Sequence, residues 1–522
     1  MEAGLMASAS GLWGVTDKKL DGWIMDNLQP SEEFSRQVKE TVKQICEFLK
    51  QQCFEENIRV QKTVKGGSAG KGTALKNNSD ADVVLFINYF SSYEKQKQDK
   101  ERWCILELIK KRLHICRDSL TFTVNISEPR YKGPNNAPRS LSFSLCSKNS
   151  ESTEVDILPA YDALGPVVKD VRPDANVFVK LLYACSSPGE FSPCFTELQK
   201  NFVKRCPPKL KNLVRLVKYW YKELVKAEHP KADLPPKYAL ELLTIYAWEV
   251  GTDSNKNFVT AEGFRTVLEL LCQHQEICIY WEEFYSLQNH QIGDHVKRLL
   301  GSRRPVILDP ADPTGILGQG KRWDLLEKVA ASHLAQLPCI KNILAWVVQP
   351  ARPVEIVVKQ LTGTRLSKTI SPSTTIWQLK EEIEKVWGIP WYQQRLAMQE
   401  PPRGNGILQN HGTLASHGIF YNTTLTLLQT APQEMEVFVR DNKTTTYRVQ
   451  PTLTVRQLKE MIHRQSGPVP AQQRLIYDST DMQDQYTLAY YKVQPRSTIH
   501  LVGRLRGGAD PRHPQFPACS PS

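Results

Sequence analysis

The sequence contains no apolar run long enough to cross a bilayer, because charged residues interrupt every hydrophobic stretch of the 522-residue chain. The first residues, MEAGLMASASGLWGV, also lack the basic start and long apolar segment of a secretory leader. We therefore expect a protein without membrane contact, located in the cytoplasm with the nucleus as an alternative.

Cysteine pairs of the C-x-x-C type are absent too, which excludes zinc-ribbon spacing. Without a leader, scattered cysteines are expected to be free thiols in a reducing compartment. The twelve cysteines stand at positions 46, 53, 104, 116, 146, 185, 194, 206, 272, 278, 339 and 519.

The composition suits a large soluble protein with several cores. Its length predicts two to four domains, and 41% hydrophobic residues are enough to fill them. The net charge of +12 permits an anionic partner without identifying one. The question is therefore where along the chain this charge is organised.

Two units near the C-terminus repeat each other. IWQLKEEIEK at 376–385 matches VRQLKEMIHR at 455–464, and GIPWYQQRL at 388–396 matches GPVPAQQRL at 467–475. Both matches fall at an offset of 79 residues, which makes coincidence improbable. Each unit predicts a strand, a turn, a strand, an amphipathic helix and further short strands.

The region before these repeats divides into a strand-rich part and a helical part. A helix is expected at about 32–52, with strands in DVVLFIN, LTFTVNI, LSFSLCS and TEVDIL, and mostly helices from about 173 onward. The Pro-rich tail ADPRHPQFPACSPS is expected to be disordered. The predicted division is 1–172, 173–348, 353–430, 434–508 and a tail at 509–522.

The stretch GGSAGKGTALKNNSDADVVLF at 66–86 opens like a phosphate-binding loop. An ATPase loop needs Gly, four residues, then Gly-Lys-Ser/Thr. Here Lys65 stands five residues before Gly70, and Gly72 follows Lys71 where a hydroxyl residue is required. The spacing therefore argues against an ATPase loop. The glycines would still let backbone amides and the Ser68 hydroxyl approach a triphosphate.

Three aspartates predict a metal site. Asp80 and Asp82 are two residues apart at the start of a strand, so both carboxylates lie on one face. Asp156, between Val155 and Ile157, sits on a second apolar strand. If the strands are neighbours, the three acids converge and could hold two Mg²⁺ ions for phosphoryl transfer, with Asp156 also able to accept a proton. The alternative is a flexible turn followed by a strand with surface acids.

A basic stripe follows the predicted helix at about 208–226. Five cations fall within about 80° of its circumference at 100° per residue, and a solvated helix face is the alternative to an anion-binding surface. The stripe consists of Lys211, Arg215, Lys218, Lys222 and Lys226. Further cations, Lys200, Lys204, Arg205 and Lys209, precede it.

The first 347 residues resemble the 2′-5′-oligoadenylate synthetases from about residue 15. The resemblance rests on the glycine-aspartate stretch and on VDILPAYDALG, KNLVRLVKYWY, PPKYALELLTIYAWE and RPVILDPADPTG. It implies an α+β fold, with a nucleotidyltransferase lobe of mixed sheet and a helical lobe. It also implies an enzyme, activated by double-stranded RNA, that joins a 2′-hydroxyl to the α-phosphate of ATP in interferon-induced antiviral defence.

The resemblance also implies roles for individual residues. Asp80, Asp82 and Asp156 would be catalytic ligands of two Mg²⁺ ions. Arg215 and Lys218 would point into the cleft, and the implied ATP contacts are Gly67, Ser68, Arg215, Lys218 and Lys237. The implied RNA surface, opposite the cleft, is Lys50, Lys65, Lys71, Lys200, Lys204 and Lys209.

Two positions depart from the family pattern. Lys237 stands where active enzymes usually carry Gln near the nucleotide, and Ile340 stands where oligomer-forming relatives carry Phe. The intact Ser68 and all three aspartates nevertheless favour a catalytically competent member, and Ile340 favours a monomer.

The repeated units resemble ubiquitin, and they predict two β-grasp domains that dock protein partners. Ile476 and Val502 match its apolar recognition patch, whereas the turn DNKTT lacks the matching Leu. Arg504-Leu505-Arg506-Gly507-Gly508 resembles the conjugating tail, but fourteen residues follow it, which favours non-covalent docking. The resulting alternative for the whole chain is an RNA-binding scaffold with weak or no catalysis, acting through these domains.

Overall fold

The computed structural model describes residues 11–52, 57–76, 79–133, 137–148, 151–399 and 406–503. It divides the chain into two units, Met1–Pro353 and Val354–Ser522. None of the described helices combines the length and the apolar character needed to cross a membrane.

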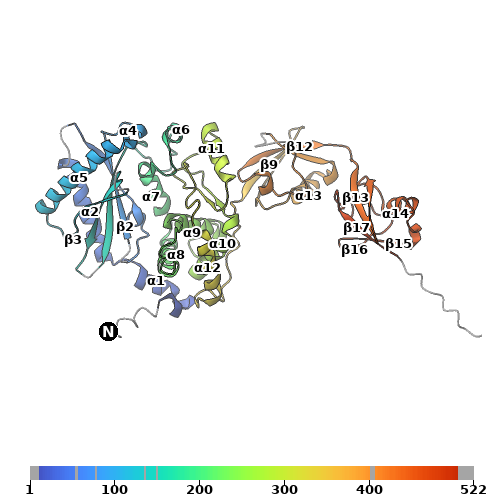
Figure 1. Ribbon diagram of the computed structural model, residues 1–522, viewed down its shortest axis with the longest axis horizontal. Helices are drawn as coiled ribbons and strands as arrows, with labels where there is room; N and C mark the ends of the chain where they lie inside the picture. The colour runs from blue at the N-terminus through green and yellow to red at the C-terminus, as the bar shows by residue number, and fades with distance from the viewer. Residues whose placement is uncertain are drawn as a thin grey trace, which may run out of the picture. The chain divides into compact units, whose positions relative to one another are not determined.

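A mixed sheet forms the first lobe of the N-terminal unit (Figure 1). Its central strands β2 (Ser79–Ile87) and β6 (Ser152–Ala160) run parallel, and all other pairs are antiparallel. Helices α2 (Glu32–Gln52) and α5 (Asp99–Ser119) pack against it and bury its apolar side. The other strands are β1 (Val60–Lys65), β5 (Ser140–Cys146), β3 (Asn125–Ile126) and β4 (Arg130–Lys132).

Two strand predictions for this lobe were incomplete. The edge strand β1 was missed because VQKTVK alternates only weakly between apolar and polar residues. LTFTVNI yields only the two-residue strand β3, since the segment pairs with β5 at the sheet edge and has no second neighbour.

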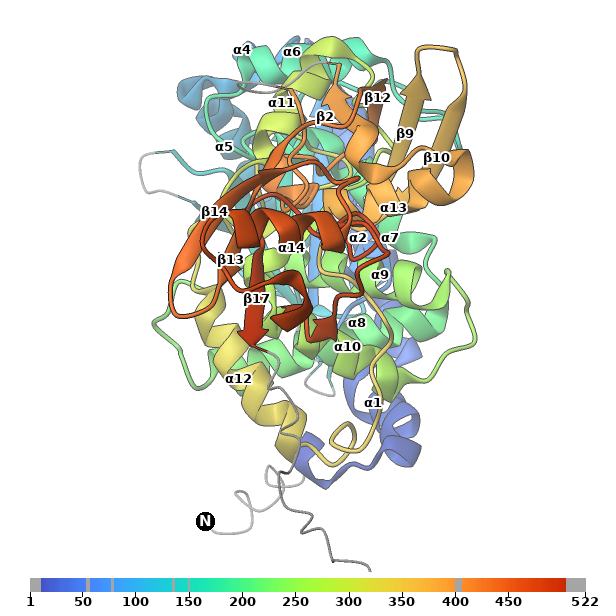
Figure 2. The same ribbon diagram turned by 90° about the vertical axis from the view of Figure 1, so that its right-hand side faces the viewer.

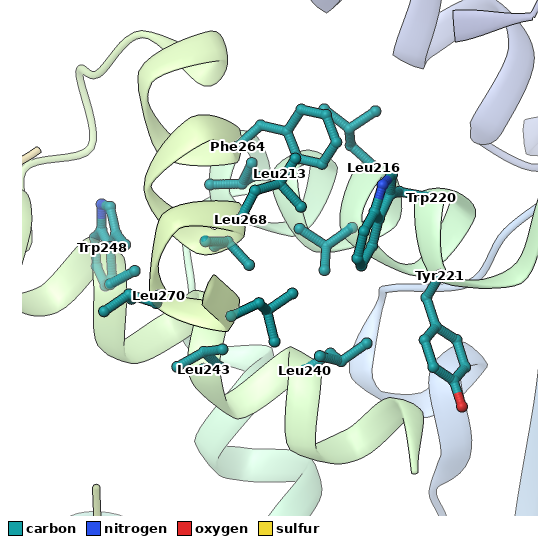
Figure 3. Packing of buried hydrophobic residues seen from close by; sticks show 14 of the residues in the cluster. Leu213, Leu216, Trp220, Tyr221, Leu240, Leu243, Trp248, Phe264, Leu268 and Leu270 are labelled. Carbon is teal, nitrogen blue, oxygen red and sulfur yellow. The ribbon is translucent and has the colours of Figure 1, made fainter. Parts of the chain in front are cut away.

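Helices make up most of the second lobe. Around its core pack α8 (Pro208–Tyr219), α9 (Lys237–Thr252) and α10 (Thr260–Cys272), as Figure 3 shows for Leu213, Leu240 and Phe264. Residues 12–28, which the sequence placed with the first lobe, also join this core through Leu20 and Ile24 of α1 (Leu20–Leu28). Other elements are α6 (Ala175–Ala184), α7 (Thr196–Lys204), α11 (His290–Leu300), α12 (Trp323–Gln336), β7 (Cys278–Ile279) and β8 (Val306–Ile307).

The predicted helix at 208–226 is not one regular α-helix. It stays α-helical to Tyr219 and continues as a π-helical segment, η4 (Trp220–Lys226). Because a π-helix has more residues per turn, the 100° spacing assumed for Lys222 and Lys226 does not hold there.

Two β-grasp modules form the C-terminal unit, as the repeat predicted (Figures 1 and 2). The first has β9 (Val354–Gln360), β10 (Arg365–Ile370), α13 (Ile376–Trp387), β11 (Gln394–Met398) and β12 (Thr423–Gln429). The second has β13 (Met435–Arg440), β14 (Thr444–Val449), α14 (Val455–Arg464), β15 (Gln473–Tyr477), β16 (Thr480–Asp481) and β17 (Thr498–Gly503).

Local sequence explains why the modules share this fold. Each helix begins with the same reciprocal capping box, Thr375 with Gln378 and Thr454 with Gln457. In each module a parallel pair, β9 with β12 or β13 with β17, lies at the centre of the sheet. The α+β multidomain fold predicted from the sequence is therefore confirmed.

Candidate active site

A cleft of about 310 Å³ lies between the two lobes of the N-terminal unit. The sheet lobe contributes the glycine loop and β2, and the helical lobe contributes α7, α8 and the start of α9. Its lining consists of Gly66, Gly67, Ser68, Lys71, Asp80, Asp82, Ser192, Thr196, Gln199, Lys218, Pro236, Lys237, Tyr238 and Glu241.

The glycine loop folds tightly onto β2. Its Gly66 amide donates to the Asp82 carbonyl at 2.6 Å, and a short helix, α3 (Gly67–Lys71), follows. Gly67 has φ +66°, and a Cβ on it would lie 2.6 Å from the Asp80 carbonyl oxygen. Only glycine fits this approach, which places the Ser68 hydroxyl 2.8 Å from Asp80 Oδ1.

Asp82 and Asp156 are direct neighbours across the parallel strands. The register pairs their Cα positions, and Asp80 shares the face of Asp82 two residues earlier. Burial raises the pKa of Asp82 to about 7, and the carboxylates of its two acidic neighbours add to the rise. The strand-pairing prediction, on which the three-acid site depended, is confirmed.

The chain's own donors already engage the other two acids. Lys132 Nζ donates to Asp156 Oδ2 at 2.7 Å, whereas the buried Asp156 Oδ1 finds no hydrogen-bond partner among the residues that the structure describes. Burial works to raise the pKa of Asp80, but two lysine ammonium groups and the Ser68 hydrogen bonds outweigh it, so this pKa lies below its ordinary value.

Binding of Mg²⁺ by Asp80, Asp82 and Asp156 stays a prediction. Among the described residues, no three His, Cys, Asp or Glu side chains lie close enough together to hold a metal ion. The donors on Asp80 and Asp156 give the physical reason, because both carboxylates turn toward them. The residues still fit Mg²⁺, since their metal-binding atoms are all carboxylate oxygens and Asp82 faces like charges. Asp156 Oδ1 also has no partner within the described part of the chain.

Two of the predicted ATP-binding cations lie in different places. Lys218 lines the cleft but is only 4% exposed, and its Nζ donates to the Thr73 carbonyl at 2.9 Å. Burial lowers the pKa of Lys218 to about 8. Arg215 does not point into the cleft, because its guanidinium donates to the carbonyls of Gly72 and Ala74 on the other side of the loop.

Lys237 and Lys71 both line the cleft but contact different acids. Lys237 Nζ is 3.9 Å from Asp80 Oδ1. Lys71, expected on the RNA surface opposite the cleft, instead lines the cleft with Nζ 3.0 Å from Glu241 and 3.9 Å from the Tyr238 ring centre. Because the glycine loop turns its ammonium toward a buried acid, Lys71 lines both the cleft and the groove on the other side of α3, and its role as an RNA contact stays a prediction.

A basic groove of about 680 Å³ borders α3 and shares Gly66, Lys71 and Asp82 with the cleft. Phe34, Val38 and Val42 of α2 form an apolar wall. Its cations are Lys39, Lys65, Lys71, Lys200, Lys204, Lys211 and Arg215. The structure therefore brings together four members of the predicted RNA surface, Lys65, Lys71, Lys200 and Lys204.

The remaining predicted RNA contacts do not line this groove. Lys209 forms an ion pair with Asp21 at 3.3 Å, so its charge is partly neutralised. Lys50 is exposed at the end of α2. Lys39, by contrast, was missed, since its charge gains meaning only when α2 meets the glycine loop, whereas Lys211 belongs to the basic stripe identified from the sequence.

Sequence reasoning also missed several cleft residues, among them Gln199, Tyr238 and Glu241. Glu241 had a signal, because an acid inside the apolar stretch YALELLTIYAW is unusual, and it is 6% exposed with Lys71 and Thr73 as partners. Gln199 had none, since TELQKNFVK reads as an ordinary amphipathic helix.

Comparison with known proteins agrees with this arrangement of domains. The nucleotidyltransferase domain profile matches residues 45–134, and "2'-5'-oligoadenylate synthetase 1, domain 2, C-terminus" matches 171–352. The ubiquitin family profile matches 356–432 and 437–506. Mouse 2'-5'-oligoadenylate synthase-like protein 2 is 39% identical over 505 residues, which cover 94% of this chain and 98% of the mouse protein.

The chain belongs to the 2′-5′-oligoadenylate synthase-like family. Mouse 2'-5'-oligoadenylate synthase-like protein 1 is 38% identical over 97% of this chain and 99% of its own length. Rat 2'-5'-oligoadenylate synthase 1A is 45% identical over 62% of this chain and 91% of its own length. This synthase-like chain thus combines a nucleotidyltransferase unit with two ubiquitin-like modules.

In the second module, strand register places the two residues matched to ubiquitin's patch on one face. Arg474 pairs with Val502 and Ile476 with His500 across β15 and β17, so Ile476 and Val502 are diagonal neighbours. Val502 is 43% exposed. The Gly-Gly sequence at 507–508 and the tail at 509–522 lie outside the described residues.

Proposed function

We propose that this synthase-like chain makes 2′-5′-linked oligoadenylates from ATP when double-stranded RNA binds it. The observation that carries the proposal is the pairing of Asp82 with Asp156 across β2 and β6, beside Asp80 and the glycine loop. Asp80 and Asp82 line a cleft that also contains cations, and Asp156 lies beside Asp82 on the next strand, an arrangement that suits the transfer of a nucleotidyl group.

The reaction would use residues already in place around the cleft. A 2′-hydroxyl oxygen bonds to the α-phosphorus of ATP, the bond to the β-phosphate breaks, and pyrophosphate leaves with the electron pair. Asp156 would accept the hydroxyl proton. The ammonium groups of Lys218 and Lys237 would lie near the phosphates, with donors from Gly67 and Ser68.

Magnesium would be held by Asp80, Asp82 and Asp156. When bound, it supplies positive charge that offsets the charge developing on the attacking and leaving oxygens. The bonds of Asp80 to Ser68 and of Asp156 to Lys132 would have to open first. RNA binding would therefore activate the chain by opening these two bonds.

Double-stranded RNA would bind the basic groove through its phosphates and 2′-hydroxyls. The groove shares Gly66, Lys71 and Asp82 with the cleft, so a change in one reaches the other through the glycine loop. Arg215 and Lys218 hold three successive carbonyls of that loop, from Gly72 to Ala74. We propose this loop as the coupling element.

The test is to incubate the purified chain with Mg²⁺, ATP and double-stranded RNA and to analyse the linkage of any product. RNA-dependent 2′-5′ product that disappears in Asp80→Asn and Asp82→Asn is expected. Wild-type chain that yields no more product than these variants would exclude the enzyme. Omission of RNA is the control for activation.

A second function is favoured by the bonds that occupy Asp80 and Asp156 and by the two complete ubiquitin-like modules. It is an RNA-binding scaffold with little or no catalysis that docks protein partners through these modules. RNA binding of wild-type strength in a chain without product formation would support this function instead. Partner binding by the full chain but not by a chain ending at Val348 would locate the docking in the modules.

A further inference from the structure

A buried carboxylate behind the cleft connects two of its lining residues. Asp309 follows β8, is 4% exposed and belongs to no element of the glycine-aspartate site. Gln199 Nε2 donates to its Oδ2 at 2.6 Å, and the Tyr238 hydroxyl donates to its Oδ1 at 3.2 Å. Gln199 lies on α7 and Tyr238 on α9, so one side chain fixes groups from two helices.

The carboxylate is itself held in place. Its Oδ1 accepts from the Ala311 amide at 2.8 Å, and the Tyr285 hydroxyl donates to the Asp309 carbonyl at 3.0 Å. Burial, with Asp312 nearby, raises the pKa of Asp309 to about 7, while the donors on its oxygens oppose that rise. An ionised carboxylate only accepts hydrogen bonds, so it orients each neighbour with a donor toward it.

This orientation has a consequence for Gln199. Its amide nitrogen is committed to Asp309 and to the Ser192 hydroxyl at 3.0 Å, which uses both of its hydrogens. Its Oε1 has no partner in the part of the chain that the structure describes, and the residue lines the cleft. An amide reversed by 180° would place its oxygen against the Asp309 carboxylate and lose that bond, although the Ser192 hydroxyl could accept from one orientation or donate to the other.

We propose that Asp309 is a positioning residue that makes Gln199 present its carbonyl oxygen, as a hydrogen-bond acceptor, to a donor group of the bound nucleotide. The donor would be a ribose hydroxyl or an exocyclic amine. Asp309 also holds the Tyr238 hydroxyl away from the cleft, so that the ring faces the Lys71 ammonium. The inference rests on the proposed function only in taking ATP as the nucleotide.

The alternative is that Asp309 merely anchors the loop after β8. Asp312 supplies a matched control, because it is also 4% exposed and lies three residues further along the same loop. Its Oδ1 accepts from the amide and hydroxyl of Thr314, and Asp312 does not line the cleft. A loop-anchoring role predicts similar effects for Asp309→Asn and Asp312→Asn.

The experiment measures binding of α,β-methylene-ATP with Mg²⁺ to the full chain by calorimetry at pH 8, above the Asp309 pKa of about 7. The variants are Asp309→Asn, Asp312→Asn, Gln199→Ala and the double variant Asp309→Asn with Gln199→Ala. We expect Asp309→Asn to weaken binding by about 10-fold in the wild-type background and by less than about 3-fold beside Gln199→Ala. Asp312→Asn should change binding by less than about 2-fold.

Equal weakening by Asp309→Asn and Asp312→Asn, or an undiminished effect of Asp309→Asn beside Gln199→Ala, would overturn the inference. So would a wild-type chain that binds no analogue. Thermal unfolding of each variant shows whether folding is intact, and an unfolded Asp309→Asn is replaced by Asp309→Glu, for which we expect the same coupling. Binding that follows the expected pattern without any 2′-5′ product would refute the enzyme while supporting the positioning role.

Discussion

Lys380 in the first ubiquitin-like module allows a quantitative test of a buried charge. It is 2% exposed, and its Nζ donates to the Gln394 carbonyl at 2.9 Å and to Asn410 Oδ1 at 2.6 Å, without a carboxylate in the bond. The equivalent Lys459 in the second module is 3% exposed and pairs with Asp484 at 2.6 Å. The perturbation is Asn410→Asp, which supplies the missing carboxylate.

The expected change in folding stability follows from the pKa of Lys380. Burial lowers the pKa of Lys380 from 10.5 to about 8, so keeping it charged in the folded module costs about 3 kcal/mol at pH 7. A carboxylate at 410 should recover about 2 kcal/mol of this, because the new group must itself be desolvated. Between pH 8 and 10.5 the unfolded chain retains a proton that the folded one has lost, so wild-type stability rises with pH. The advantage of Asn410→Asp should therefore shrink over that window.

Hydrogen exchange of the full chain followed by mass spectrometry separates the two modules. At pH 7 the slowest amides of α13 and β11 should become about 30-fold better protected in Asn410→Asp, with α14 and β15 unchanged as an internal control. Asp484→Asn is the reverse substitution and should reduce protection in α14 and β15 only, because it leaves a buried charge without its partner. Unchanged or lower protection in Asn410→Asp would refute the reasoning that the uncompensated charge limits the first module.

Three further outcomes are expected. Asp82→Asn should raise the stability of the synthetase unit by about 1–2 kcal/mol in Mg²⁺-free buffer, because it relieves like-charge repulsion, and should abolish product formation; a lower melting temperature would contradict this. Lys237→Gln removes an ammonium that would compete with Mg²⁺ for the acids, and it should lower the Mg²⁺ concentration for half-maximal thermal stabilisation about 3-fold. An unchanged half-maximal Mg²⁺ concentration would argue that the lysine does not compete with the metal. Lys204→Glu should weaken binding of double-stranded RNA by about 10-fold and flatten its salt dependence, whereas Lys209→Glu should do less because that lysine already has an acidic partner; equal effects would exclude the groove as the main surface.

The parts of the candidate site that depend on residue spacing within one strand or one loop could be predicted from the sequence. Period-two spacing placed Asp80 and Asp82 on one strand face, and the apolar residues around Asp156 marked a second buried strand. The glycines of the loop likewise predicted a close approach of the backbone to a neighbouring group, and Gly67 makes such an approach to β2. These features depend on neighbours within a few residues, so the sequence contains them.

The direction of long side chains was not predictable in the same way. Arg215 and Lys218 are three residues apart on α8, yet one binds loop carbonyls beside the groove and the other is buried beside the cleft. Lys71 was expected on the RNA surface opposite the cleft, yet it lines both the groove and the cleft and meets Glu241, which lies 170 residues later. A flexible cation takes the nearest buried acid or carbonyl, and only the folded chain decides which one is near.

By itself, the sequence determined the division into a synthetase unit and two repeated modules, because capping boxes, strand alternation and the repeated QQRL segment are local signals that specify each element. It also determined which carboxylates share a strand face. Only the tertiary structure decided that Asp82 lies beside Asp156, that donors already occupy Asp80 and Asp156, and that Asp309 stands behind the cleft. These are contacts between segments distant in the chain, whose energies depend on burial and mutual distance, and neither quantity exists before the lobes pack together.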